Sequence, residues 1–210
     1  MIPAQERYSP ETTINPPFEL SYWYTGLLTA QKWKERLGLE PERTWDSVMM
    51  LLSPLPQVDG LYLGAESAVD SYTNQRFMTD HPMVLGAFGM LPMTPLMDTV
   101  TMRKTFEFVW ENWHWDETWG WDFPMVAMSA TRLGMPGKAI DALFMDVQTN
   151  TYLPNGHNYQ DSRLRLYLPG NGGLLTAVAM MCAGYTGSEE NNPGFPKNGK
   201  WNVKWEGLNK

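Results

Sequence analysis

Apolar residues recur every three or four positions along much of the chain, which predicts a protein built mainly from helices. Over residues 19–37 the apolar side chains follow this period, and Gly38 supplies a residue suited to ending the helix. A second helix is predicted to open at Pro41 and to end at the break formed by Pro54 and Pro56. Two helices joined by such a short turn form a hairpin.

The middle of the chain predicts two further hairpins. Residues 82–91 are apolar and glycine-rich, and Asp98 is placed to cap an amphipathic helix after them. Residues 122–133 are apolar nearly all round, with Asp122 expected as the N-cap and Gly134 as the stop. The chain then restarts as a helix at Pro136.

One more helix is expected to open at Gly172 and Gly173 and to remain apolar on every face as far as Gly184. Helices that are apolar all round therefore alternate with amphipathic ones. An inner ring covered by an outer ring needs both kinds, whereas a simple bundle needs only the amphipathic kind. The predicted fold class is all-α, formed by helical hairpins of a partial (α/α) toroid.

Two stretches depart from the helical pattern. Residues 57–79 are rich in glycine, aspartate and serine, with one short strand or turn expected at Leu61–Leu63, and so long a loop is a functional candidate. Near the C-terminus, Trp201, Val203 and Trp205 alternate with polar residues, which predicts a β-strand. We therefore divide the chain into a helical domain over 1–187 and a polar tail with a strand over 188–210.

Composition narrows the function classes. The 210 residues carry a net charge of -7, so no basic field favours nucleic acid as a partner. One cysteine and three histidines disfavour a disulfide framework or a zinc cluster, and no metal or other cofactor is expected. The longest apolar run, over 174–183, is shorter than the roughly 18 to 20 residues that cross a bilayer, so no membrane partner is expected.

The residues that could carry chemistry form three clusters. The densest, over 110–123, interleaves five tryptophans with His114, Asp116, Glu117 and Asp122. Tryptophan faces stack on sugar rings and carboxylates move protons, although core packing with a helix cap would explain the same residues. A second cluster over 155–161 and a third over 66–81 are polar loops, where solvation is the simpler explanation. Nucleotide-binding glycine motifs and a serine nucleophile elbow are missing, which leaves carboxylate chemistry.

An ordered series of short elements resembles glycoside hydrolase family 95, the α-L-fucosidase group of the six-hairpin glycosidases. The first part of the series begins at Leu55-Pro56-Gln57 and ends at Leu91-Pro92. Between these two elements it includes Gly60, Glu66, Asp70 and His81. The second part pairs Asn158-Tyr159-Gln160-Asp161 with Gly170-Asn171-Gly172 at the family's spacing. The resemblance covers roughly residues 3–185 and implies the C-terminal half of a helical-toroid catalytic domain.

The resemblance also implies catalytic roles. Pro3-Ala4-Gln5-Glu6 is similar to the family element whose glutamate is the general acid, which makes Glu6 the acid candidate. The aspartate that supplies the family's base falls on Pro169, which has no group that accepts a proton. Asp122, Asp161 and Glu66 are the replacement candidates, and we favour Asp122 because it opens an inner helix beside the tryptophans. The family's arginine falls on Pro82, so fucose need not be the substrate.

The resulting expectation is a glycoside hydrolase, or part of one, that acts on oligosaccharides or polysaccharides. Catalysis is assigned to Glu6 and Asp122, and sugar binding to Glu66, His81, Trp119, Trp121, His157, Asn158, Asp161 and Asn171. The alternatives are a non-catalytic carbohydrate-binding or structural helical domain, and a polysaccharide lyase with His157 or Tyr159 as base.

Half a ring would expose inner helices, so we expect a homo-oligomer or a missing N-terminal half of the domain. Six hairpins need on the order of 350 residues, about twice what this chain supplies. The start of the chain does not resemble a signal peptide, and a periplasmic or secreted parent protein is expected.

Overall fold

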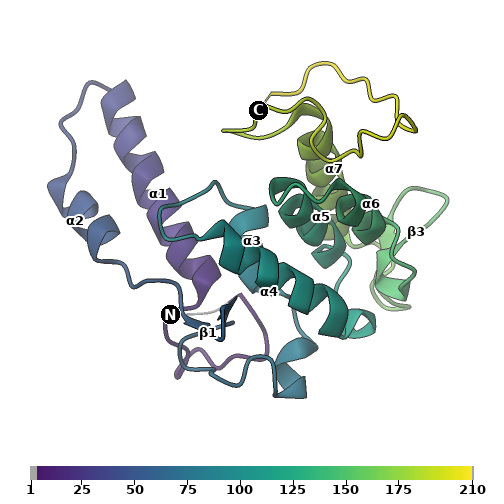
Figure 1. Ribbon diagram of the computed structural model, residues 1–210, viewed down its shortest axis with the longest axis horizontal. Coiled ribbons are helices and arrows are strands. Elements are labelled where there is room, and N and C mark those ends of the chain that lie inside the picture. The colour runs from purple at the N-terminus through teal and green to yellow at the C-terminus, as the bar shows by residue number, and fades with distance from the viewer. Residues whose placement is uncertain (1–3, 210) are drawn as a thin grey trace.

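The structure, a computed structural model, describes residues 4–209 and is mostly helical (Figure 1). Its helices are α1 Pro17–Arg36, α2 Arg43–Leu51, α3 Met83–Gly89, α4 Thr99–Asn112, α5 Asp122–Arg132, α6 Pro136–Leu143 and α7 Leu168–Ala183. Short 3₁₀ turns occupy Gln75–Met78, Trp115–Glu117 and Gln148–Asn150. The all-α class is thus confirmed at the level of helix content.

Two small antiparallel ribbons interrupt the helices. Strand β1 (Gln57–Val58) pairs with β2 (Leu61–Tyr62), with Gln57 opposite Tyr62. Strand β3 (Thr151–Tyr152) pairs with β4 (Asn158–Tyr159), with Thr151 opposite Tyr159. The first ribbon contains the short strand expected near residue 61, and the second lies beside the start of α7.

Helices α3 and α5 form the centre of the core. Every residue of α3 is buried, as is α5 from Asp122 to Thr131, and α5 packs against α3, α6 and α7 (Figure 1). The two helices approach closely at Gly89, where an added Cβ would lie 2.9 Å from the backbone oxygen of Met125. The Ser129 hydroxyl also donates to the carbonyl of Leu85 at 2.8 Å. The all-apolar pattern of these segments therefore did mark buried helices.

Local stop and start signals explain most helix ends. Asp98 caps α4, since its Oδ2 accepts from the N–H of Thr101 at 2.8 Å. Gly134 and Gly184 follow α5 and α7 with positive φ, as glycine permits. Helix α7, however, begins at Leu168 and not at Gly172, so the predicted start was wrong. Pro169 in the first turn has the helical φ and needs no N–H partner there, which lets the helix open earlier.

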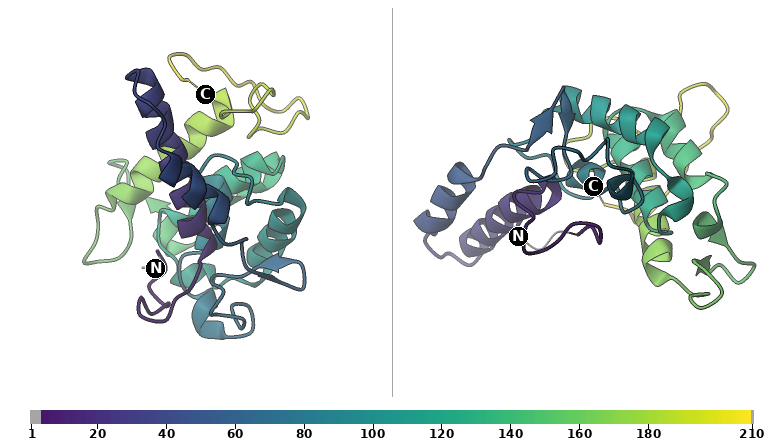
Figure 2. Two further views of the ribbon diagram at one scale, coloured as in Figure 1. Left: turned by 90° about the vertical axis from the view of Figure 1, so that its left-hand side faces the viewer. Right: turned by 90° about the horizontal axis from the view of Figure 1, so that it is seen from below.

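Helix α1 leaves much of its apolar stripe in solvent. Trp23 and Trp33 are 55% and 57% exposed, Leu37 directly after the helix is 67% exposed, and no residue of α2 is buried. The two helices are joined through Gln31, whose amide oxygen accepts from the N–H of Glu42 and whose amide nitrogen donates back to its carbonyl, both at 2.9 Å. Figures 1 and 2 show α1 and α2 as an arm that extends away from α5, α6 and α7.

The expected C-terminal β-strand is absent from the described residues, and this prediction was wrong. Residues 199–207 run without regular structure because no neighbouring strand offers backbone partners, and alternation alone does not make a ladder. Instead, the ring of Trp201 lies 5.2 Å from that of Phe195, and Trp205 Nε1 donates to the Asn192 side chain at 3.1 Å. The tail is held to α7, where the Gly194 N–H donates to the Met181 carbonyl at 3.1 Å.

The division at residue 187 stays a prediction. Among the described helices, none combines the length and the apolar character needed to cross a membrane.

Candidate functional site

A buried histidine and aspartate form the centre of the candidate site. His81 stands two residues before the start of α3, and Asp122 is the first residue of α5, so the packing of these two helices brings the side chains together. His81 Nδ1 lies 3.0 Å from both carboxylate oxygens of Asp122. Asp122 is fully buried, and its Oδ2 also accepts from the N–H of Trp119 at 2.8 Å.

These contacts correct the expected role of Asp122 as a helix cap. Trp121 occupies the N-cap position of α5, and no side chain caps this helix. The Asp122 carboxylate instead turns back toward Trp119 and across to His81. The aspartate therefore orients the imidazole, as a carboxylate does in a histidine-based catalytic unit.

Burial and charge act together on this pair. Burial lowers the pKa of His81, but the hydrogen bond and negative charge of Asp122 outweigh it, with further contributions from Asp80 and Glu6, so that pKa is raised. Burial raises the pKa of Asp122, opposed by the hydrogen bond and charge of His81. When the imidazole is neutral with its proton on Nδ1, Nε2 is left as an acceptor. No residue in 4–209 forms a hydrogen bond to Nε2.

Aromatic rings surround the imidazole. The ring of Trp121 lies 4.8 Å from that of His81 in an edge-on arrangement, and the ring of Trp119 lies 6.1 Å away. Tyr167, next to the start of α7, is 5.6 Å from Trp119. Burial, with the charges of Asp122 and Glu6, raises the pKa of Tyr167 to about 12, so its phenol stays protonated at neutral pH. The structure thus joins His81 to both tryptophans that the sequence had singled out.

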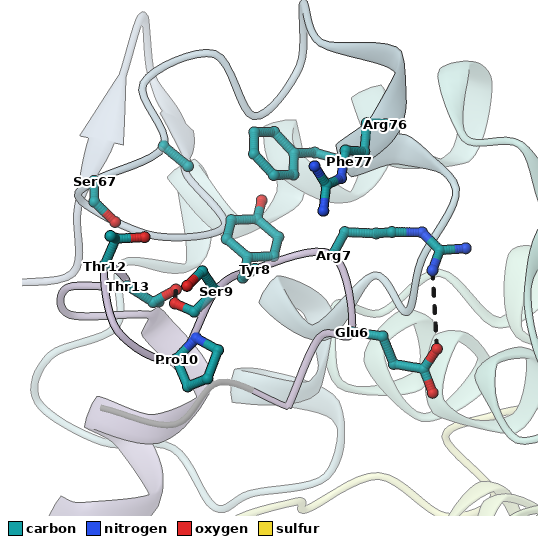
Figure 3. A pocket seen from close by; sticks show the side chains of 11 residues that line it. Glu6, Arg7, Tyr8, Ser9, Pro10, Thr12, Thr13, Ser67, Arg76 and Phe77 are labelled. Atoms are coloured by element: carbon teal, nitrogen blue, oxygen red, sulfur yellow. Dashed lines mark hydrogen bonds and ion pairs between the residues drawn. The ribbon is translucent and has the colours of Figure 1, made fainter.

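Asp80 fastens the N-terminal segment to this site. Its carboxylate accepts from the backbone N–H of His81 at 2.7 Å and from that of Arg7 at 2.6 Å. Its carbonyl accepts from Trp113 Nε1 at 2.7 Å. Glu6 is therefore held near enough for its charge to contribute to the raised pKa of both His81 and Tyr167. Its side chain is half exposed and lies 3.9 Å from the Arg7 guanidinium (Figure 3).

Three of the expected binding residues lie away from His81. Glu66 is exposed and accepts from the side chain of Asn15 at 2.7 Å. Asp161 closes a turn, where its Oδ1 accepts from two backbone N–H groups within 2.8 Å. His157 lies in the turn between β3 and β4, where only its backbone forms hydrogen bonds among the described residues. The structure does not bring these side chains to His81.

Asn158 and Asn171 serve to hold the scaffold. Asn158 is fully buried and donates to the carbonyls of Thr149 and Thr151, at 3.0 and 3.2 Å. Asn171 accepts from the N–H of Asn158 at 3.0 Å and donates to a neighbouring carbonyl. A Cβ at Gly120 would overlap the Asn158 carboxamide, so glycine permits this close approach. The amides thereby fix the loop between Trp119 and Trp121.

Sequence reasoning missed Tyr167 and Gln160 at this site. Gln160 accepts from the N–H of Gly120 at 2.9 Å and so also fixes the tryptophan loop. Pro169, where the resemblance places the base, is an exposed residue in the first turn of α7. The signal for Tyr167 was its position two residues before this element.

Among residues 4–209, no group of three or more histidine, cysteine, aspartate and glutamate side chains is arranged to hold a metal ion. Chemically, the cluster offers the His81 Nε2 acceptor with Asp122 behind it, the nearby carboxyl group of Glu6, and the rings of Trp119 and Trp121.

No protein-family model matches the chain, and no match was found among the curated proteins or the solved structures.

Proposed function

We propose that this chain is a glycoside hydrolase, or the part of one that contains its active site, and that it cleaves a neutral sugar unit. The observation that carries the proposal is the contact of His81 Nδ1 with Asp122 at 3.0 Å between two tryptophan rings. Such rings suit the apolar faces of sugars, and a carboxylate-backed imidazole suits proton transfer.

In the proposed mechanism, Glu6 is the general acid that protonates the leaving glycosidic oxygen. His81 Nε2 takes the proton of the attacking water, and Asp122 stabilises the imidazolium that forms. The sequence assigned the base to Asp122 itself. In this mechanism His81 is the base, and the fully buried Asp122 supports it. Both carboxylate oxygens of Asp122 lie against His81 Nδ1, and neither is exposed. Direct attack of this carboxylate on the anomeric carbon is therefore disfavoured. Because water attacks instead, we expect inversion at the anomeric carbon.

The charges around His81 favour a neutral reacting sugar. Asp80, Asp122 and Glu6 all act on His81 as negative groups. A uronate bound against the imidazole would be repelled by these carboxylates. This argues against the lyase alternative, whose proposed bases His157 and Tyr159 are also on the β3–β4 ribbon and not beside His81.

The fold proposed for this activity is part of an (α/α) toroid. The fully buried α3 and α5 have the character of inner helices, while α4 is amphipathic with Met102, Phe106 and Val109 buried. Exposed apolar side chains on α1 and on α7, such as Leu175, are of the kind that further helices cover in a closed ring. We propose that association of copies covers them.

Hydrolysis of a panel of aryl glycosides and oligosaccharides tests the proposed function. Glu6→Gln and His81→Gln should each lower kcat/KM at least a hundredfold, because general acid or base catalysis contributes about 10² to 10⁴. Glu117→Gln is the matched control, since this glutamate is exposed on the 3₁₀ turn Trp115–Glu117 and its charge acts on neither His81 nor Asp122. Full activity in His81→Gln would refute the proposed base.

A second candidate function is sugar binding without turnover. It is favoured by the complete burial of Asp122, because no carboxylate at the centre of the site is open to solvent. Calorimetric binding of a sugar that the wild-type protein leaves intact would select this function over hydrolysis.

A further inference from the structure

A second feature of the chain, a pocket beside Glu6, differs in chemistry from the His81 site. Its volume is about 460 Å³, within the range of small-ligand sites. It lies between the N-terminal segment and the loop before α3 (Figure 3). Charged, aromatic and hydroxyl side chains line it, among them Glu6, Arg7, Arg76 and Phe77.

Two guanidinium groups and one carboxylate line this pocket, although the chain carries a net charge of -7. Arg7 and Arg76 line it against the single carboxylate of Glu6. The Arg7–Glu6 pair is separated by 3.9 Å and is partly exposed, so it holds Arg7 only weakly. The Arg76 guanidinium has no hydrogen-bond or ion-pair partner among residues 4–209. An arginine fork of this kind matches a sulfate or carboxylate group.

The rest of the pocket offers surfaces for a sugar ring. Tyr8 and Phe77 stack with their ring centroids 4.5 Å apart, and hydroxyl groups of Thr12 and Ser67 lie across from them (Figure 3). Burial raises the pKa of Tyr8 to about 12, so the phenol adds no negative charge at neutral pH. Tyr8 is buried and supports the partly exposed ring of Phe77, which together with hydroxyl groups is suited to a carbohydrate.

Two further carboxylates near Tyr8 are already engaged. Asp80 accepts from two backbone N–H groups, and Asp70 accepts from the side chain of Asn74 at 3.0 Å. Neither of them lines the pocket. The unpaired guanidinium of Arg76 therefore remains the group best placed to meet an anion.

We propose that this pocket binds a sugar unit bearing a singly charged oxyanion, either a sulfate ester or a carboxylate. Because Glu6 belongs both to the pocket and to the surroundings of His81, the charged unit lies on the leaving-group side of the bond that is cut. This last assignment rests on the proposed function, whereas binding of the charged sugar does not. The reacting unit is neutral and its neighbour is charged.

Isothermal titration calorimetry on the full chain tests the pocket, with four probes: a methyl hexoside monosulfate, a methyl hexuronide, the neutral methyl hexoside and inorganic sulfate. At least one charged sugar should bind tenfold or more tightly than the neutral one, and Arg76→Gln should remove that advantage. Arg43→Gln, at an exposed position on α2, is the matched control. The two charged sugars distinguish a sulfate site from a carboxylate site.

His81→Gln separates this proposal from the proposed hydrolase. The variant should bind the charged sugar as the wild type does, because His81 does not line the pocket. If the wild type binds the charged sugar but hydrolyses nothing, the pocket stands and the hydrolase fails. Equal affinity for charged and neutral sugars, unchanged binding in Arg76→Gln, or equal binding of inorganic sulfate alone would overturn the pocket proposal.

Discussion

The body of the molecule and its N-terminal arm use similar apolar sequence in opposite ways. In the body, α5 is buried all round and carries Asp122 against His81, so a charge is held in a fixed place. In the arm, Trp23 and Trp33 of α1 remain more than half exposed. An apolar stripe therefore predicts a helix in both regions. The first turns of α1 also pack against α3, but only the packing of α3 against α5 builds a site.

The largest difference between the regions should appear on removing Asp122. Asp122→Ala leaves the buried imidazole and the N–H of Trp119 without their acceptor. Breaking one side of such a buried pair costs about 3–5 kcal/mol, which urea unfolding will measure. Asp141→Ala, at an exposed position on α6, should change stability by less than about 0.5 kcal/mol. Equal effects at both positions would contradict the account of the pair.

Two glycines give the next contrast. Gly89→Ala places a methyl group 2.9 Å from the backbone of α5 and should destabilise the protein by about 1–3 kcal/mol. Gly26→Ala in α1 meets nothing within 4 Å and should stabilise it by about 0.4–1 kcal/mol. If the body is tightly packed and the arm is open, thermal unfolding will show a lower Tm for Gly89→Ala and a higher Tm for Gly26→Ala. Loss of stability at both would show that the arm is covered.

The pH dependence of stability isolates the histidine. The folded-state pKa of His81 is raised, chiefly by Asp122, so its stabilising contribution is fully present below its unfolded pKa of about 6.5. That contribution is lost as pH rises through the folded pKa. Denaturation of the wild type should show this fall, and His81→Gln should flatten it. If the wild type instead became more stable as pH rises through this range, and His81→Gln removed that rise, the pKa of His81 would be lowered by folding and not raised.

The smallest effect on folding is expected in the arm. Trp23→Ser should change the free energy of unfolding by less than about 0.5 kcal/mol, because the indole is already 55% exposed. If copies associate through this apolar face, light scattering should show a lower molar mass for the variant. An unchanged oligomer would place the association elsewhere.

Local signals made much of the helical pattern predictable. Gly134 and Gly184 end helices because glycine, which has no side chain, adopts a positive φ without strain. Asp98 caps α4 by accepting from the N–H of Thr101, only three residues further along the chain. The expected strand around Trp201 failed because a strand depends on a partner elsewhere in the chain. Features settled by one short segment were predictable, and those settled by a distant partner were not.

The candidate site shows the same division. The chemistry of His81, Trp119 and Trp121 was visible in the sequence, but the role of Asp122 depends on a residue 41 positions away. Its position before Phe123 and Pro124 is equally typical of a helix cap, so only tertiary packing decides between the two roles. The sequence predicts Asn158 and Asn171 as ligand contacts, yet their amides hold the scaffold.

The most direct test of the central claim is the anomeric form of the sugar first released from the most active glycoside of the panel, followed by proton NMR. The account predicts the inverted anomer, because His81 and Asp122 activate water and both Asp122 oxygens face the imidazole. Release of the retained anomer would require a carboxylate nucleophile at this site and would contradict the proposed role of the His81–Asp122 pair.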